Sequence, residues 1–254
     1  MKYFKLTIYS LFFLASLGSV HYVSAFTCGD NITFNYKGNQ VTYVTVSVGS
    51  QCWMDRNLGA TKVATSYNYC ATQDTDCSYG DYFQWGRLDD GHQTYNSSTT
   101  ATRATTPYPG HSQFILGAAS NYDWLADANQ NNNLWQSVST YQNNPCPSGW
   151  HVPTGGTTGE WDTAMDTLGL TSCTGTPTDC RILAANSTLK LPAAGYRLAS
   201  DGALSLQGSQ GSYWSSSPTQ YSYTAEKLVF TSTGVNPTFS NSRTYGIAAR
   251  CMKN

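Results

Sequence analysis

The stretch Cys146-Pro147-Ser148-Gly149-Trp150-His151-Val152-Pro153-Thr154 precedes the one segment of the chain with a clear helical pattern. Each of its two prolines holds φ at about −65° and removes a backbone donor. A proline also disfavours helical geometry in the residue before it. The stretch is therefore predicted to be extended and then turned, and to lead the chain into a helix.

The segment that follows has the signals of a helix start, an apolar face and a helix end. Thr157 and Glu160 have the Thr-x-x-Glu spacing of a capping box. Gly169 stands where a residue with left-handed geometry commonly ends a helix. Between them the spacings i, i+3, i+4 and i+7 place on one apolar face Trp161, Ala164, Met165 and Leu168. We expect the β strands of the protein to pack against this short amphipathic helix.

The first 25 residues have the pattern of an export signal. Lys2 and Lys5 supply positive charge, residues 6–17 an apolar core, and Val23-Ser24-Ala25 the small residues before a cleavage site. The apolar core is shorter than the roughly 20 residues that span a bilayer, so no membrane insertion is expected. We expect a secreted or cell-surface protein, extracellular or periplasmic, that is cleaved near Ala25.

Charge and composition narrow the class of protein further. Without Lys2 and Lys5, 12 basic and 15 acidic side chains remain, a formal net charge of −3, and no basic cluster occurs. Nucleic acid is therefore not expected as a partner. Charged residues are only 11% of the chain, while tyrosine and uncharged polar residues are abundant, which is typical of an extracellular β-rich protein.

Eight cysteines predict a disulfide framework, because all of them follow the export signal and such chains fold under oxidising conditions. Two pairs bracket short polar turns, and the remaining four cysteines are assigned so that one bond ties the central stretch to the last strand. The predicted bonds are Cys70–Cys77, Cys173–Cys180, Cys28–Cys52 and Cys146–Cys251. A metal site is the alternative, but the chain has no Cys-x-x-Cys pair and its histidines are scattered. We expect neither metal nor cofactor.

Short strands are predicted on both sides of the helix. A strand at 33–36, a turn at 37–39 and a β-branched run at 41–48 are followed by a turn at Gly49-Ser50, which leads into residues 51–58. After the helix, a turn at 200–203 joins hairpin arms at 196–199 and 203–206. Three more strands are predicted at 213–216, 225–231 and 246–252. Short antiparallel sheets with few helices define the α+β class.

The region 89–144 is the least regular part of the chain. It is rich in threonine, asparagine and proline, and it is predicted to form long loops. Short helices are predicted beside it at 82–86 and within it near Trp124. The chain shows neither an internal repeat nor a linker, so one domain is expected.

Several blocks of the sequence, in order, resemble one known family. They are Gln51-Cys52-Trp53-Met54-Asp55-Arg56-Asn57-Leu58, Tyr79-Gly80-Asp81-Tyr82-Phe83-Gln84-Trp85-Gly86-Arg87, Asn144-Pro145-Cys146-Pro147-Ser148-Gly149-Trp150, Leu191-Pro192-Ala193-Ala194-Gly195-Tyr196-Arg197, Tyr213-Trp214-Ser215-Ser216 and Gly246-Ile247-Ala248-Ala249-Arg250-Cys251. In these blocks the chain is similar to the Fibrobacter succinogenes major paralogous domain family. That family usually ends in Ser-Val-Arg-Cys, where this chain has Ala-Ala-Arg-Cys.

The resemblance implies a single domain over residues 26–254 with a C-type-lectin-like fold, the fold of the formylglycine-generating enzyme. The C-terminal part also looks like retroelement-diversified variable receptors, in which a constant framework carries variable surface positions. Fold does not carry activity with it, and the formylglycine-generating enzyme needs free cysteines that this chain is not expected to have.

Catalytic signatures are absent from the sequence: it has no Gly-x-Ser-x-Gly, His-Glu-x-x-His or phosphate-binding loop motif, and we expect no enzyme activity. The alternative is a carbohydrate-active enzyme that uses loop carboxylates, for which Asp89 with Asp90 or Asp123 with Asp127 are the candidates. His151, between two apolar residues, is interpreted as a structural histidine.

Tyrosines that alternate with serine, threonine and asparagine in the last third of the chain point to a ligand-binding surface. Tyrosine supplies rigid amphipathic area, and small polar residues adapt to the partner. The candidate ligand-binding residues are Tyr213, Tyr221, Tyr223, Asn236, Phe239, Asn241, Arg243 and Tyr245. The scaffold beneath them is predicted to include Trp214, Phe230 and Cys251. The expected partner is an extracellular protein or glycan, and the protein is expected to be a monomer.

A plainer explanation is that these tyrosines only reflect the strand preference of aromatic residues. The protein would then be a structural component of the cell envelope.

Overall fold

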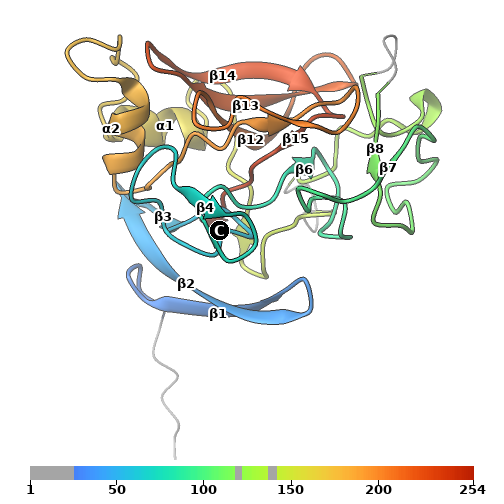
Figure 1. Cartoon of the computed structure of the whole chain (residues 1–254), viewed down its shortest axis with the longest axis horizontal. Helices are drawn as coiled ribbons and strands as arrows, with labels where there is room; N and C mark the ends of the chain where they lie inside the picture. The colour runs from blue at the N-terminus through green and yellow to red at the C-terminus, as the bar shows by residue number, and fades with distance from the viewer. Residues whose placement is uncertain (1–25, 118–121, 137–141) are drawn as a thin grey trace, which may run out of the picture.

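The computed structural model describes residues 26–117, 122–136 and 142–254, so the predicted export signal lies outside the described residues. The described chain consists of short sheets, mostly antiparallel, with two α-helices and four disulfides, which places it in the α+β class. Figure 1 shows a hairpin from the start of the chain on one side and a sheet from its last third on the other. Neither α-helix in the described part of the chain has the length to cross a bilayer.

The start and the end of the described chain meet in one antiparallel sheet. Its strand order is β1-β2-β3-β16-β9. The strands are β1 (Asn31–Tyr36), β2 (Asn39–Val48), β3 (Gln51–Met54), β9 (Trp150–His151) and β16 (Met252–Lys253). The predicted hairpin is confirmed, β3 follows the predicted turn at Gly49-Ser50, and the central stretch of the sequence lies at the edge of this sheet as β9.

All four predicted disulfides are confirmed. Cys28–Cys52 fastens the residues before β1 to β3. Cys146–Cys251 joins the residues before β9 to the residue before β16, over a sequence separation of 105. Cys70–Cys77 and Cys173–Cys180 each close a separation of seven residues.

The predicted helix is α1 (Glu160–Thr167), but its start differs from the prediction. Thr157 does not cap it; the N-cap residue is Gly159, which has no side chain to do so. The reciprocal hydrogen bonds of a capping box instead join Glu160 to Thr154. The Glu160 N–H donates to Thr154 Oγ1 over 3.0 Å, and the Thr154 N–H donates to Glu160 Oε2 over 2.8 Å.

The apolar face of α1 is confirmed. Trp161, Ala164 and Met165 are buried, and Trp161 packs on Trp53 of β3 with ring centroids 4.9 Å apart. Gly169 ends the helix with φ +67°, a conformation that costs glycine little.

A second helix, α2 (Cys180–Asn186), was not predicted. Asp179 caps it by accepting from the Arg181 N–H. Its buried residues are Cys180, Ala184 and Ala185, which are too small and too few to give a clear apolar pattern in a helix of seven residues.

A three-stranded antiparallel sheet lies on the opposite side of the molecule from the β1–β2 hairpin, with α1 and α2 at one of its ends (Figure 1). Its order is β12-β13-β14, formed by β12 (Gly211–Pro218), β13 (Thr224–Phe230) and β14 (Val235–Ser242). The first two strands were predicted. β14 was not predicted; it is an edge strand, where Pro237 and polar residues are tolerated.

Between these sheets lies a smaller one of order β11-β10-β15-β6, formed by β6 (Phe83–Gln84), β10 (Tyr196–Arg197), β11 (Leu204–Ser205) and β15 (Gly246–Ile247). The β10–β11 hairpin confirms the predicted turn. The helix predicted at 82–86 is wrong, because Phe83 pairs with Ile247 in the sheet. The expected helix near Trp124 is only a 3-10 turn, η1 (Asp127–Asn129).

Two further pairs of short strands lie in the loop regions. They are the antiparallel pair β4 (Cys70–Thr72) and β5 (Asp76–Cys77), and the parallel pair β7 (Thr99–Thr100) and β8 (Phe114–Ile115). Described residues of the irregular region contribute aromatic side chains to the core. Trp85, Trp124 and Trp135 belong to one core cluster with Trp214 of β12.

Candidate functional site

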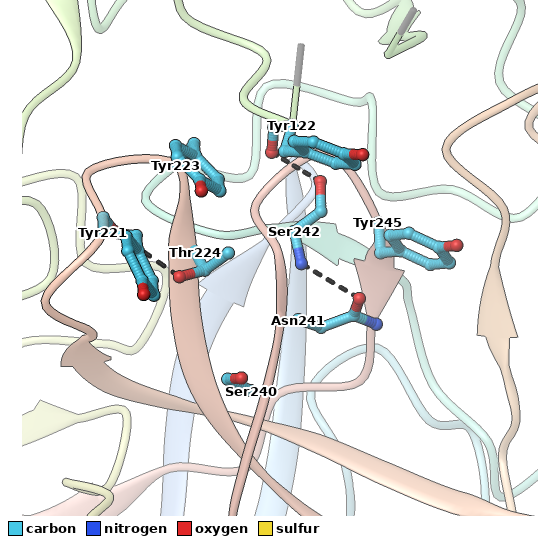
Figure 2. A pocket seen from close by; sticks show the side chains of 8 residues that line it. All are labelled: Tyr122, Tyr221, Tyr223, Thr224, Ser240, Asn241, Ser242 and Tyr245. Carbon is cyan, nitrogen blue, oxygen red and sulfur yellow. Dashed lines mark hydrogen bonds between the residues drawn. The ribbon is translucent and has the colours of Figure 1, made fainter. Parts of the chain in front are cut away.

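A pocket of about 460 Å³ opens at one end of the β12–β14 sheet, and tyrosines form much of its wall (Figure 2). Small polar residues complete it. Its lining residues are Tyr122, Tyr221, Tyr223, Thr224, Ser240, Asn241, Ser242 and Tyr245. We refer to it as the tyrosine pocket. Its volume falls in the range of about 300–1,000 Å³ that is typical of small-molecule sites.

One wall of the tyrosine pocket comes from the turn between β12 and β13. The Tyr221 and Tyr223 rings stack there, with centroids 5.7 Å apart and an interplanar angle of 22°. The turn is closed by Thr219, whose N–H donates to Thr224 O, and by Thr224, whose N–H donates to Tyr221 O. The exposed Tyr221 ring is thus presented by an ordered turn.

A second wall comes from a distant segment of the chain. The Tyr122 ring lies 5.5 Å from the Tyr223 ring, and the Tyr122 carbonyl accepts a hydrogen bond from Ser242 Oγ. The next residue, Asp123, is fully buried and lies 3.6 Å from Arg243. Burial raises the pKa of Asp123 to about 6, and the charge of Arg243 opposes that rise. This buried contact fixes the chain beside Tyr122.

The remaining wall contains Asn241 and Tyr245. Asn241 Oδ1 accepts from the Ser242 N–H over 2.9 Å, which orients the side-chain amide. The Tyr245 ring packs edge-on against Tyr196 with centroids 5.6 Å apart. Burial, and to a lesser extent Tyr196, raises the pKa of Tyr245, so its hydroxyl stays a neutral donor at ordinary pH.

Four of the predicted ligand-binding residues come together in the tyrosine pocket: Tyr221, Tyr223, Asn241 and Tyr245. Asn236 and Phe239 are exposed on β14 but do not line it.

The other two predicted ligand-binding residues, Tyr213 and Arg243, are buried and do not line the tyrosine pocket, so a ligand in this pocket would not contact them. Tyr213 points into the core, where its hydroxyl donates to Pro192 O over 2.6 Å and its ring packs on Trp161. Arg243 lies over the Trp85 ring, 4.1 Å from its centroid, and donates to Asn131 O and Asn132 Oδ1. Tyr213 therefore belongs to the core around α1, and Arg243 to the core beside Trp85.

The sequence did not single out Tyr122, Thr224, Ser240 or Ser242. Ser240 and Ser242 follow once β14 is recognised as a strand. Tyr122 lies about a hundred positions from the other tyrosines, and nothing local in the sequence marks it.

The loop carboxylates proposed for an enzyme form ion pairs with arginine side chains or lie away from the tyrosine pocket. Asp90 contacts Arg87 Nη2 and His92 Nδ1, each at 2.6 Å. Burial would raise the pKa of Asp90, but His92 and Arg87 outweigh it and lower the pKa to about 2. Asp127 pairs with Arg103 at 2.7 Å. None of the four candidate carboxylates lines the tyrosine pocket.

A second, smaller pocket of about 300 Å³ surrounds the start of α1, lined by Gln136, His151, Thr154, Glu160, Ser216, Met252, Lys253 and Asn254. His151 Nε2 lies 2.9 Å from Glu160 Oε2, and its Nδ1 lies 2.8 Å from Asn254 Oδ1. The histidine thus connects β9, α1 and the last residue. Within the described ranges, no three His, Cys, Asp or Glu side chains are placed to hold a metal ion.

The model of a domain of unknown function (DUF8237) matches residues 183–252. This segment holds every lining residue of the tyrosine pocket except Tyr122. No curated protein and no solved structure matches the chain.

Proposed function

We propose that this chain is a secreted or cell-surface protein that binds an extracellular ligand in the tyrosine pocket without transforming it. The observation that carries the proposal is the convergence of Tyr122 with three tyrosines of the 221–245 region around one open cavity. Tyrosines that only filled a core would turn their rings inward. Here the Tyr221 ring remains 53% exposed although the turn that carries it is ordered.

The chemistry of the pocket suits recognition. Stacked phenol rings offer flat apolar faces with a polar edge, and they lose little conformational freedom on binding. The hydroxyl and amide groups of Thr224, Ser240 and Asn241 supply hydrogen bonds beside those faces. A glycan or a peptide segment of an extracellular protein offers the matching mixture of groups.

The proposed location outside the cytoplasm is supported by the four disulfides, since such frameworks form in oxidising compartments. The export-signal pattern of residues 1–25 agrees with it.

We also propose that the fold is C-type-lectin-like and that the chain is a divergent relative of the Fibrobacter succinogenes major paralogous domain family. Support comes from the sequence blocks that resemble that family. The meeting of the first and last strands in one sheet agrees with such a fold, as do the two helices and the long loop region that reaches the tyrosine pocket.

Replacing Tyr221 and Tyr245 by serine tests the proposal. Ligands are first found with a glycan array and with a pull-down from surface extracts, using the wild-type protein. The double variant is expected to bind them at least about tenfold more weakly, because aromatic anchors dominate the affinity of such sites. Its melting temperature should fall only slightly, since Tyr221 is exposed and Tyr245 is only partly buried.

Tyr108→Ser is the matched control, because Tyr108 is 58% exposed and does not line the pocket. Its binding should equal that of the wild type. Full binding by the double variant contradicts the proposal. Chemical conversion of the bound ligand, followed by mass spectrometry, would contradict the non-catalytic part and return attention to the loop carboxylates.

A further inference from the structure

Three of the rings that line the tyrosine pocket form a row (Figure 2). The Tyr223 ring lies in the middle, 5.7 Å from the Tyr221 ring and 5.5 Å from the Tyr122 ring, with interplanar angles of 22° and 34°. The two end members, Tyr221 and Tyr122, are 53% and 49% exposed. Ring surface at both ends of the row is therefore open to a ligand, and contacts within the row hold the rings in place before a ligand arrives.

The pocket also presents groups that donate and accept hydrogen bonds. Within the described residues, no protein partner is bound to the hydroxyls of the four lining tyrosines or to Ser240 Oγ. Asn241 Oδ1 accepts from the Ser242 N–H, so the two amide hydrogens of Asn241 remain to donate. Sugar hydroxyls likewise donate and accept, whereas an ionised carboxylate only accepts.

The lining of the pocket is electrically neutral, since all eight of its side chains are uncharged at neutral pH. Of the charged residues on the neighbouring strands, Arg243 pairs with the buried Asp123 at 3.6 Å, and Lys227 is 2% exposed and does not line the pocket. Residues 118–121 contain no acidic or basic side chain either. A charged ligand would lose hydration in this pocket without gaining a counter-charge, which is unfavourable.

The arrangement of the rings also disfavours a cationic ligand. A cage for an ammonium group surrounds the cation with ring faces, each within about 6 Å of it. Rings stacked 5.5–5.7 Å apart leave no space between them for such a group.

The edge strand β14 beside the pocket is poorly suited to binding a peptide as an added strand, because such binding uses the free backbone groups of the edge. The Thr238 N–H donates to Asn236 Oδ1 over 2.9 Å. In the same way, the Ser242 N–H donates to Asn241 Oδ1 over 2.9 Å. Pro237 has no N–H to offer. The strand's own side chains thus occupy donors that a peptide backbone would need.

We propose that the tyrosine pocket binds an uncharged sugar residue of an extracellular glycan. The inference rests on the proposed function and names its ligand class. The apolar face of the sugar ring would lie against the tyrosine row, and its hydroxyls would bind the Asn241 amide and the Tyr245 hydroxyl. A neutral sugar matches all three properties of the pocket: exposed aromatic surface, mixed donors and acceptors, and no charge.

Calorimetry with defined hexasaccharides tests the inference. The neutral probes are cellohexaose, mannohexaose, N-acetylchitohexaose and methyl-esterified hexagalacturonate. The charged probes are the de-acetylated and de-esterified counterparts of the last two, which keep ring and linkage. The wild-type protein is expected to bind at least one neutral probe, and to bind each charged probe at least about tenfold more weakly than that one.

Two asparagines of β14 provide a matched pair of variants. Asn241→Ala removes the amide from the pocket and should weaken binding of the neutral probe at least about fivefold, as expected for a lost hydrogen bond. Asn236→Ala is the control, because Asn236 also accepts from a backbone N–H of β14 but does not line the pocket. Its affinity should equal that of the wild type. An indirect effect through loosening of β14 would appear in both variants.

The inference is overturned if a charged probe binds as tightly as the best neutral one, or if no neutral probe binds. Equal affinities of the Asn241→Ala and Asn236→Ala variants also overturn it. If Asn241→Ala does not fold, Tyr245→Phe replaces it: loss of the hydroxyl alone should weaken binding several-fold, and an unchanged affinity overturns the inference.

The proposed function is judged separately, on ligands captured from surface extracts. Protease treatment should leave their capture intact, and periodate, which cleaves the diols of sugars, should abolish it. The reverse result, with capture lost in the Tyr221/Tyr245 double variant, would keep the tyrosine pocket as a ligand site and overturn the assignment of a sugar.

Discussion

At the scale of single residues, Glu160 shows how one side chain joins several elements. Its Oε2 accepts from the Thr154 N–H and from Thr154 Oγ1, and it pairs with His151 Nε2. Burial alone would raise the pKa of Glu160 and lower that of His151. Their mutual contact outweighs burial in both cases, so the pKa of Glu160 is lowered and that of His151 is raised.

The stabilisation from this pair depends on pH with a definite sign. The raised pKa of His151 means that its contribution is complete below about pH 6.5 and is lost as the pH rises through the folded-state pKa. The lowered pKa of Glu160 means that its contribution is present above about pH 4.3 and is lost as the pH falls through the folded-state value. The pair therefore stabilises the fold most between these two limits.

Glu160→Gln tests this pH dependence, because glutamine still accepts from Thr154 but cannot hold His151 in its charged form. The variant should lose more stability at about pH 5.5 than at about pH 9. We expect a difference on the order of 1 kcal/mol, because solvent screens this half-buried pair. Urea unfolding of both proteins at the two pH values measures it. A destabilisation that is the same at both would show that the ion pair contributes nothing beyond its hydrogen bonds.

At the scale of elements, the start of α1 depends on Thr154. The Thr154 side chain accepts the Glu160 N–H, whereas Thr157 is exposed and lies outside the cap. Thr154→Ala should therefore lower the free energy of unfolding by about 1 kcal/mol, the usual effect of a lost cap. Thr157→Ala is the matched control and should change it by less than about 0.5 kcal/mol. Thermal or denaturant unfolding of the two variants measures both losses of stability. A larger loss in Thr157→Ala than in Thr154→Ala would show that Thr157, and not Thr154, caps the helix.

Elements with local signals were predictable from the sequence, and elements that depend on their neighbours were not. The apolar face of α1, the glycine turns of the hairpins and the cysteine spacings are local, and all were read correctly. Phe83–Gln84 is a strand only because residues 246–247 lie beside it. β14 was missed because an edge strand with one polar, solvent-facing side and an internal proline lacks the usual strand pattern.

The same division applies to the candidate site. Tyr221, Tyr223, Asn241 and Tyr245 could be proposed from composition together with the resemblance to variable receptors, since they lie close together in sequence with small polar residues around them. Tyr213 belongs to the same run of tyrosines, but strand alternation and contact with α1 turn it into the core. Only the tertiary structure shows that Arg243 lies against the buried Asp123. This contact places Tyr122, the residue before Asp123, at the pocket.

At the scale of the whole molecule, the fold is closed by contacts between distant parts of the chain. β16, at the end of the chain, lies between β3 and β9, and the buried Arg250 donates to Asn57, Met54 O and Leu189 O. The irregular region and the β12–β14 sheet are attached to this frame. The position of the tyrosine pocket therefore depends on closure of the chain as a whole.

The Cys146–Cys251 disulfide is the covalent part of that closure, and its removal should cost more than removal of a local disulfide. In the chain-entropy model, a loop of the size closed by Cys146–Cys251, with a sequence separation of 105, is worth about 4.7 kcal/mol. The seven-residue separation of Cys70–Cys77 corresponds to about 2.4 kcal/mol. The double variants Cys146→Ala/Cys251→Ala and Cys70→Ala/Cys77→Ala remove one bond each without adding a buried hydroxyl. Guanidinium unfolding should show Cys146→Ala/Cys251→Ala to be less stable than Cys70→Ala/Cys77→Ala by about 2 kcal/mol, because the substitutions are the same and only the loop length differs. Equal losses would mean that packing of β16 between its neighbours, and not the covalent link, holds the two ends of the chain together.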